Sequence, residues 1–240
     1  LDLRPLEFDL VVVFGGDGSV LRSARRMAER QRPVLGVNLG RLGFLAALPP
    51  DELESWFPKV ASGECRIVHH LMLHCTVSRG EEVIASRMGL NEAAILGGPP
   101  YSILDVDLYV DGLWATTYSC DGLIIATPVG STAHNLSAGG PILRKTIAAF
   151  VISAISPHTL TVRPVVDAAD RVYEMSVREP HQATAVVVDG KELAQLTAED
   201  RVRVVRAEPT FQLIEVEAQN DYRTLREKLG WRGSISAPPR

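Results

Sequence analysis

The sequence contains few cysteines and no long apolar run. Cysteine occurs only at Cys65, Cys75 and Cys120, with no C-x-x-C pair, so a disulfide-stabilised scaffold is excluded and a reducing, cytoplasmic setting is expected. No apolar stretch reaches the about 18 residues that a membrane-spanning helix needs. The sequence begins without a methionine, and we expect neither a signal peptide nor a membrane partner.

The charge balance lacks the excess of basic residues that marks nucleic-acid-binding proteins. Lys and Arg total 25 against 29 Asp and Glu, which gives a formal net charge of -4, and no long basic run occurs. We therefore predict no nucleic-acid partner and no binding to anionic membranes. At 46% hydrophobic and 22% charged residues, the composition is that of a globular protein.

Residues 1–64 alternate between strand and helix patterns. Residues 10–14 (LVVVF) form a continuous β-branched run, typical of a strand buried on both faces, and residues 34–37 predict a second strand. Residues 19–31 and 51–61 have the apolar spacing of amphipathic helices. This alternation predicts an α/β domain with a parallel sheet.

From residue 65 onward, short apolar runs are separated by turn residues. Asp111-Gly112 and Asp189-Gly190 are strong two-residue hairpin sequences. The predicted strands are residues 67–77, 82–88, 103–110, 113–118, 123–126, 171–177, 183–188, 201–205 and 211–216. The apolar segment 147–155 suits a helix. We therefore expect a mostly-β domain over residues 65–218, and then a tail (219–240) whose short helix at 222–229 returns to the N-terminal domain.

The most specific motif is FGGDGS at residues 14–19, between a predicted strand and a predicted helix. Glycines at this place let backbone N–H groups approach phosphate oxygens, and the helix N-terminus favours an anion. Asp17 is the only ionisable side chain of the loop, and because a carboxylate repels phosphate it must take part in chemistry or meet Mg²⁺. A tight turn with an aspartate cap explains the same residues. The loop is neither a Walker A loop nor a Rossmann fingerprint.

Two further segments predict ligand contacts. Residues 122–141 (GLIIATPVGSTAHNLSAGGP) combine glycines and hydroxyl side chains at low charge, which suits a loop that binds ribose and amide groups. Asn91-Glu92 interrupts an apolar run and is costly unless its polar atoms are satisfied, for example by ribose hydroxyls. The alternatives are an ordinary surface loop and a polar face on an edge strand. The histidines and cysteines at 65–75 lack the spacing of a zinc site, so no metal site is predicted.

Taken together, these segments resemble the NAD kinase family of ATP-dependent NAD 2′-kinases. The matching segments are GGDGS at 15–19, GVNLGRLGFL at 36–45, Asn91-Glu92, residues 121–141, SPHTL at 156–160 and LREKLGW at 225–231. GGDG alone is shared with lipid and sugar kinases of the same superfamily. The resemblance implies an N-terminal α/β domain of the NAD kinase/diacylglycerol kinase-like type, here with its first β-α unit missing or trimmed. It also implies a mostly-β C-terminal domain, with the active site between the two.

The implied reaction is transfer of the ATP γ-phosphate to the 2′-hydroxyl of the adenosine ribose of NAD, giving NADP. Asp17 would be the general base, and Mg²⁺ or another divalent cation would accompany ATP. The implied phosphate-side residues are Gly15, Gly16, Gly18 and Ser19. The implied NAD-binding residues are Asp17, Gly18, Phe44, Asn91, Glu92, Asp121, Thr132, Ala133, His134, Asn135, Leu136, Ser137, Ile155 and Lys191. The resemblance further implies a homodimer or homotetramer.

The chain departs from the family pattern at three positions: His134 replaces Tyr, Cys120 replaces Gly, and Lys191 replaces Gln. The basic residue that steadies the transferred phosphate stays open among Arg22, Arg41 and Arg163. Two other functions also stay open, a lipid kinase of the diacylglycerol or sphingosine type and a dinucleotide-binding regulatory protein without turnover. The polar segment at 132–140 argues against the lipid kinase, and retention of Asp17 argues against the regulator.

Overall fold

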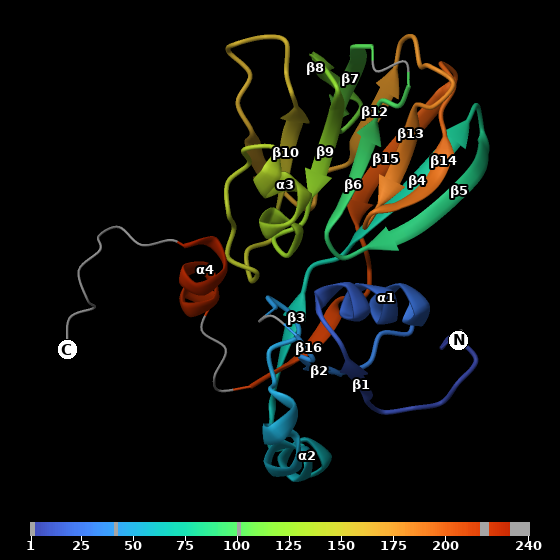
Figure 1. Cartoon of the computed structure of the whole chain (residues 1–240). Coiled ribbons are helices and arrows are strands. Elements are labelled where there is room, and N and C mark those ends of the chain that lie inside the picture. Colours follow the sequence, from blue (N-terminus) through green and yellow to red (C-terminus); the bar gives the residue numbers. More distant parts are fainter. Residues whose placement is uncertain (1–2, 41–42, 100–101, 217–220, 231–240) are drawn as a thin grey trace. The chain divides into compact units, whose positions relative to one another are not determined.

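A computed structural model describes residues 3–40, 43–99, 102–216 and 221–230 of the chain, except the side chains of Asp221 and Arg223. The chain forms two compact units (Figure 1). Unit 1 comprises Leu1–His69 with Gln212–Arg240, and unit 2 comprises His70–Phe211.

Unit 1 contains a four-stranded sheet in the order β1-β2-β16-β3. Its strands are β1 (Val11–Phe14), β2 (Val34–Val37), β3 (Arg66–His70) and β16 (Phe211–Glu215). Its helices are α1 (Asp17–Met27), the 3₁₀ turn η1 (Pro50–Glu52), α2 (Leu53–Ala61) and α4 (Asp221–Leu229). The β1–β2 and β2–β16 pairs are parallel, as the α/β pattern predicts.

The core of unit 1 joins distant parts of the chain. Leu35, Val37 and Leu48 pack with Ile214 and Val216, and α2 contributes Val60. Residues 211–216 were expected in the β-rich domain, but as β16 they extend the sheet of unit 1, where Leu213 pairs with Val34. Strand periodicity indicates that a strand forms and not which sheet accepts it.

Unit 2 is a sandwich of two six-stranded antiparallel sheets. One sheet has the order β11-β10-β9-β6-β13-β14 and the other β5-β4-β15-β12-β7-β8. The first comprises β6 (Glu92–Leu96), β9 (Gly122–Ala126), β10 (Ala149–Ile155), β11 (Val165–Ala168), β13 (Ala185–Val188) and β14 (Lys191–Gln195). The second comprises β4 (Leu73–Arg79), β5 (Glu82–Gly89), β7 (Leu104–Val110), β8 (Leu113–Cys120), β12 (Tyr173–Val177) and β15 (Asp200–Arg206).

Both Asp-Gly pairs form the predicted hairpins. Asp111 and Gly112 have φ of 51° and 78°, and Asp189 and Gly190 have φ of 48° and 68°, as a two-residue turn with left-handed backbone requires. The core between the sheets is apolar. Its largest side chains include Phe150 and Tyr173, whose rings pack edge to face with their centroids 5.8 Å apart.

Four local predictions need correction. The apolar segment 147–155 is a strand, β10, and not a helix. The predicted strand 67–77 is two strands, β3 and β4, that belong to different units. The helix predicted over 19–31 begins at Asp17 and ends at Met27, where Ala28 adopts φ 51°. The expected irregular loop after β9 contains two short helices, η2 (Gly130–Thr132) and α3 (His134–Ser137).

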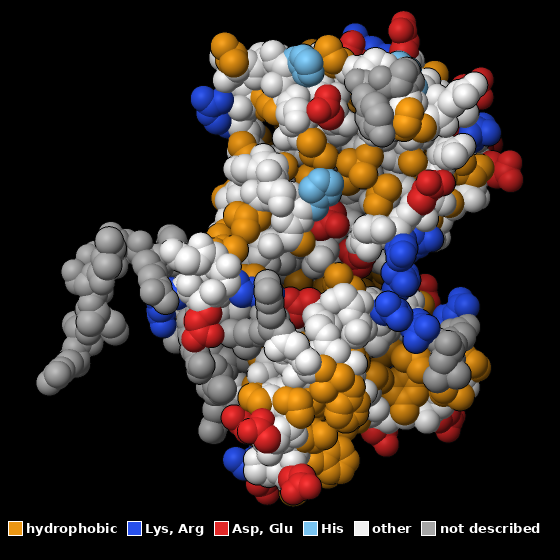
Figure 2. All heavy atoms as spheres, in the orientation of Figure 1, with side chains coloured by type: hydrophobic (Ala, Val, Ile, Leu, Met, Phe, Trp, Pro, Cys, Tyr) orange, Lys and Arg blue, Asp and Glu red, His pale blue; other side chains and the backbone are white. Residues whose placement is uncertain are grey.

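The surface agrees with the balanced composition. Figure 2 shows acidic and basic side chains on both units, without one sign covering the face that it draws. Within the described ranges, no helix has the length and apolar character needed to cross a bilayer.

Candidate active site

Asp17 belongs to the glycine-rich loop and is also the first residue of α1, and its carboxylate binds another loop of unit 1. Oδ2 accepts the backbone N–H of Phe44 at 2.8 Å, and Oδ1 accepts those of Leu45 and Ala46 at 2.9 and 3.1 Å. The carboxylate is half-buried, and three successive peptide groups fix its position. This arrangement suits a group that must meet a substrate atom in one defined geometry.

Gly43 makes the approach of Asp17 possible. A Cβ at this position would overlap Oδ1 of Asp17 and crowd the carbonyl oxygen of Ala46. Gly43 donates its own N–H to that carbonyl at 3.2 Å, which closes the loop around the carboxylate. The glycine is therefore required by the close contact and not by an unusual backbone angle.

Lys228 brings a positive charge to the same carboxylate from the C-terminal helix α4. Its Nζ lies 3.5 Å from Asp17 Oδ2 and 4.7 Å from the ring centroid of Phe44. Two-thirds of the lysine side chain is buried, with 31% exposed. The helix predicted at 222–229 thus reaches the glycine-rich loop, which it joins in unit 1.

Asn91 directly precedes β6 of unit 2 and Glu92 begins it, and a second carboxylate fixes both residues. Asp189 Oδ1 accepts the N–H groups of Asn91 and Glu92 at 2.7 and 3.2 Å, and Oδ2 accepts that of Leu90 at 2.8 Å. The Asp189 N–H in turn donates to the Glu92 carbonyl at 3.0 Å. The Asp-Gly hairpin turn therefore determines where the Asn91 and Glu92 side chains lie.

Thr127 holds the carbonyl side of the same segment. Its Oγ1 donates to the Leu90 carbonyl at 2.5 Å, and its N–H donates to the Asn91 carbonyl at 2.8 Å. Gly130 packs so closely that a Cβ there would overlap the Asn91 peptide group. Residues 90–92 are thus held from both sides, while the Asn91 side chain stays partly exposed.

Glu92 is buried and its carboxyl group is short of partners. Oε2 has no hydrogen-bond partner among the described residues. Burial raises the pKa of Glu92 to about 8, and the charge of Asp189 contributes to the rise. At neutral pH this carboxyl group is therefore mostly protonated, so it can donate as well as accept a hydrogen bond.

The comparisons place this geometry in a family. Residues 2–65 match the model of the ATP-NAD kinase N-terminal domain, and residues 90–216 match that of the ATP-NAD kinase C-terminal domain. An NAD kinase of Rhodopirellula baltica is 62% identical over 235 residues, which are 98% of this chain and 76% of that protein. The chain belongs to the NAD kinase family.

Solved structures agree with this assignment. Yeast NADH kinase complexed with NADH matches with a TM-score of 0.90 at 27% identity, over 97% of this chain and 69% of that one. An NAD kinase from Archaeoglobus fulgidus in complex with ATP matches with a TM-score of 0.76 at 28% identity, over 93% and 82% of the two chains. The predicted fold class, and the prediction of an enzyme that phosphorylates NAD, are confirmed by these matches. The lipid-kinase alternative is not supported.

The structure distributes the residues that the NAD kinase resemblance selected over both units. Unit 1 contains Gly15, Gly16, Asp17, Gly18, Ser19 and Phe44, and the loop and Phe44 both lie around the Asp17 carboxylate. Unit 2 contains Asn91, Glu92, Asp121, Thr132, Ala133, His134, Asn135, Leu136, Ser137, Ile155 and Lys191. In unit 2, the Asp121 N–H donates to the Ile155 carbonyl at 2.9 Å, and Lys191 is exposed next to the Asp189 turn.

The Asn135 side chain is hydrogen-bonded within unit 2. It is fully buried, its amide donates to the carbonyls of Ser131 and Pro141 at 3.0 and 3.1 Å, and its oxygen accepts from Ser153 Oγ at 2.7 Å. Ser137 on the same short helix is exposed, whereas Thr132 and His134 are partly exposed. Asn135 thus stabilises the turn from which its neighbours project.

Three residues that contact predicted site residues of their own unit were not among the sequence candidates. Asp189 was noticed only as a turn residue, Gly43 only as part of a matching segment, and Lys228 only within the C-terminal motif. Of the basic candidates, Arg22 is exposed on α1, and Arg163 donates to the carbonyls of Leu160 and Val162 at 2.8 and 2.7 Å. Arg41 lies outside the described residues, as do Leu42 and Trp231 of the matching motifs.

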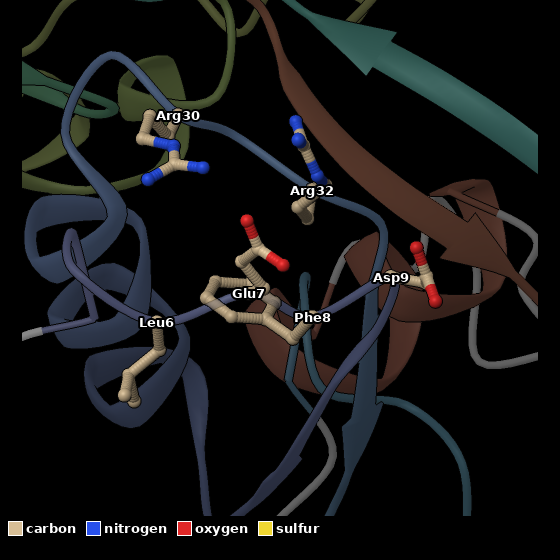
Figure 3. A pocket seen from close by; sticks show the side chains of 6 residues that line it. All are labelled: Leu6, Glu7, Phe8, Asp9, Arg30 and Arg32. Atoms are coloured by element: carbon tan, nitrogen blue, oxygen red, sulfur yellow. The ribbon is translucent and has the colours of Figure 1, made fainter.

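A cavity of about 190 Å³ in unit 1 lies apart from these residues (Figure 3). It is lined by Leu6, Glu7, Phe8, Asp9, Arg30 and Arg32, and Figure 3 shows side chains of both charge signs around it. None of the predicted site residues lines this cavity, so it does not belong to the candidate site.

Proposed function

We propose that this chain transfers the γ-phosphoryl group of ATP to the 2′-hydroxyl of the adenosine ribose of NAD, with Asp17 as the proton acceptor. The observation that carries the proposal is the Asp17 carboxylate, which three backbone N–H groups fix within the glycine-rich loop, at the start of α1. The family assignment and the neighbours solved with NADH and with ATP support the two substrates.

The two substrates supply the reacting atoms, and Asp17 supplies the proton acceptor. The 2′-oxygen attacks the γ-phosphorus, a new O–P bond forms, and the bond between the γ-phosphorus and the β–γ bridging oxygen breaks, so ADP leaves with that electron pair. The hydroxyl proton passes to Asp17. Because phosphoryl transfer requires little covalent help, most of the rate enhancement comes from positioning and charge stabilisation.

We assign NAD binding to the buried Glu92 and to those predicted residues that are exposed or partly exposed, and phosphate binding to the glycine-rich loop. Gly15, Gly16, Gly18 and Ser19 lie around the N-terminus of α1. The Ser19 N–H already donates to the Gly16 carbonyl at 2.9 Å, so the N–H groups that precede it, which have no acceptor earlier in the helix, are the ones proposed for phosphate. Asn91 and Glu92 offer amide and carboxyl groups to the dinucleotide from a segment fixed by Asp189. We propose further NAD contacts for four residues of the same unit that are exposed or partly exposed, Asp121, Thr132, His134 and Ser137. His134 offers an aromatic face where the family commonly has Tyr.

The divalent cation is proposed to arrive with ATP. No group of three or more His, Cys, Asp or Glu side chains gathers within the described part of the chain, so these residues do not fit a resident metal site. Mg²⁺ is commonly held by substrate phosphates and water with few protein ligands. We therefore propose Mg²⁺–ATP as the substrate.

We also propose a homodimer or homotetramer in the cytoplasm. The sheets of unit 2 end in edge strands, and β8 at one edge exposes Leu113 and Trp114 at its start. Unpaired strand edges with apolar side chains favour association between copies. The three cysteines are free thiols, which suits a reducing compartment. Light scattering of the purified protein would give the number of subunits.

The decisive assay is NADP formation from NAD, Mg²⁺ and ATP, read with an NADP-specific dehydrogenase, for the parent chain and Asp17→Asn. We expect the variant to lose about 10²–10⁴-fold in kcat, as for loss of a general base, while NAD still binds in equilibrium dialysis. Asp51→Asn is the matched control because Asp51 is an exposed acidic residue in the first turn of η1 of the same unit. Its rate should equal that of the parent.

Two outcomes contradict the proposal at different points. An unchanged rate for Asp17→Asn would refute the base assignment while leaving the reaction intact. A parent chain that binds NAD but makes no NADP would support the regulatory alternative instead.

A further inference from the structure

We infer that Lys228 is a catalytic residue: it occupies an acceptor position on Asp17 that the substrate hydroxyl takes over, and it then contacts the transferred phosphoryl group. The inference deepens the proposed function and rests on it. It starts from the contacts of the Asp17 carboxylate, which involve backbone groups and a single side chain among the described residues.

The acceptor positions of Asp17 are fully used. A carboxylate offers about four lone-pair positions, two on each oxygen. Oδ1 accepts from Leu45 and Ala46, and Oδ2 accepts from Phe44 and from Lys228. A ribose hydroxyl that gives its proton to Asp17 therefore has to replace one of these four donors.

Lys228 is the donor that can leave. The other three are peptide N–H groups of one short loop, at 2.8 to 3.1 Å, and they cannot move separately. The Lys228 contact is the longest, at 3.5 Å, and it is made by a side chain with a flexible stem. The substrate hydroxyl is thus expected to displace the ammonium from Oδ2, the oxygen that becomes protonated.

The displaced ammonium stays beside the reaction. The Phe44 ring, with its centroid 4.7 Å from Nζ, attracts the cation through its π face and limits how far the side chain moves. The attacking oxygen lies at the position that Nζ has left, so the γ-phosphoryl oxygens come within reach of the three ammonium donors. Lys228 keeps its proton throughout and stabilises the negative charge of the phosphoryl group, while Asp17 receives the hydroxyl proton.

The sequence candidates fit this role less well. Arg163 uses its guanidinium on two local carbonyl groups, and Arg22 is exposed on α1 without a contact to Asp17 among those described. The alternative for Lys228 is a purely structural role, because a cation in the last turn of a helix interacts favourably with the helix dipole. Arg226 lies in the same last turn of α4 and is exposed, so replacing Arg226 measures the effect of a charge on the helix dipole alone.

The test compares Lys228→Met, Lys228→Arg and the control Arg226→Ala in steady-state NADP formation, with thermal unfolding as a check on folding. Met keeps the stem over Phe44 and removes the charge, and we expect kcat to fall about 10²-fold, as when one donor to a developing charge is removed. The KM for NAD should change less than about threefold, because the lost contact is to the transferred phosphoryl group and not to NAD. Lys228→Arg should recover most of the lost rate, and Arg226→Ala should match the parent.

The double variant Asp17→Asn/Lys228→Met separates contact with phosphate from support of Asp17. If Lys228 touches the phosphoryl group, the residual rate of Asp17→Asn falls further when Lys228 is replaced. An unchanged residual rate would mean that Lys228 acts only through Asp17 and would overturn the inference. An active parent with a fully active Lys228→Met variant would overturn the lysine assignment alone, whereas a parent without NADP formation would overturn the proposed function and this role together.

Discussion

Asp189→Asn tests whether the hairpin carboxylate positions Asn91 and Glu92. Asp189 adopts φ 48° and accepts three successive N–H groups from residues 90–92. Asn tolerates the left-handed backbone as well as Asp does, so the substitution leaves the turn unstrained. It replaces one carboxylate oxygen by an NH₂ group, and in either amide orientation at least one backbone N–H then faces another donor.

The expected cost follows from the bonds that are lost. A hydrogen bond to a charged group contributes about 1.5–3 kcal/mol, and an unsatisfied donor adds a penalty of similar size when it is buried. Asp189 is only partly buried, so we expect the free energy of unfolding to fall by about 2–3 kcal/mol. A free-energy change of about 1.4 kcal/mol corresponds to a factor of ten in affinity. If displacement of Asn91 and Glu92 weakens NAD binding by about half of the 2–3 kcal/mol, the Kd for NAD rises about tenfold.

The assay is isothermal titration of NAD together with chemical unfolding of the same variants. Asp111→Asn is the matched control, because Asp111 holds the same turn position at φ 51° and its carboxylate binds Val172 N–H and Arg171. We expect this control to lose stability without a change in NAD affinity. If Asp189→Asn weakened NAD binding no more than Asp111→Asn does, Asp189 would be a structural turn residue and the positioning argument would be refuted.

Three further predictions follow from single contacts. Gly43→Ala places a methyl group against Asp17 Oδ1 and should lower kcat by at least about tenfold, because the base is then misplaced. Gly40→Ala is the control and should keep the parent rate, since a Cβ at Gly40 meets open space. If both variants had the same kcat, the close contact between Gly43 and Asp17 would not matter for catalysis. Glu92→Gln should remove a pH dependence of stability. The pKa of Glu92 is about 8 in the folded protein and about 4.5 in an unfolded chain, so between these values only the folded protein keeps the proton. The free energy of unfolding of the parent should therefore fall by up to about 4 kcal/mol as the pH rises from 4.5 to 8. An equal change in unfolding free energy between pH 5 and pH 8 for the parent and Glu92→Gln would contradict the burial of this carboxyl group. Asp200→Ala leaves Arg79 and the Thr197 N–H without the carboxylate that accepts their hydrogen bonds at 2.8 and 2.7 Å. Because Arg79 still reaches water, we expect the free energy of unfolding, measured by chemical denaturation, to fall by about 2–3 kcal/mol. A decrease of less than about 1 kcal/mol would show that the Arg79–Asp200 pair contributes little to stability.

Patterns local in the sequence predicted most of the fold. The β-branched run before the glycine loop is β1, and each Asp-Gly pair is a hairpin turn with positive φ. The strand β10 was mistaken for a helix because all but its last residue is buried, and a continuous apolar run of this length fits both structures. The placement of β16 depends on its pairing with Val34, which lies far away in the sequence.

The candidate site was predictable where one motif contains the chemistry. Asp17 is such a case, since a carboxylate among glycines at a strand end is unusual in itself. Lys228 and Asp17 are 211 positions apart, and Asp189 is 97 to 99 positions from the groups that it binds. Asn135 shows the opposite limit, because a polar residue in a polar loop is as able to satisfy its own turn as to bind a ligand.

Both units use the same device, a carboxylate bound by three successive backbone N–H groups. Asp17 binds those of residues 44–46, and Asp189 binds those of residues 90–92. Successive N–H groups that converge in this way form an anion-binding concavity. Here the protein's own carboxylates fill both, so neither set of N–H groups is available to the phosphates of ATP. We therefore propose that in unit 1 the α1 N-terminus and a cation hold the phosphate, and Lys228 is the cation that lies beside Asp17.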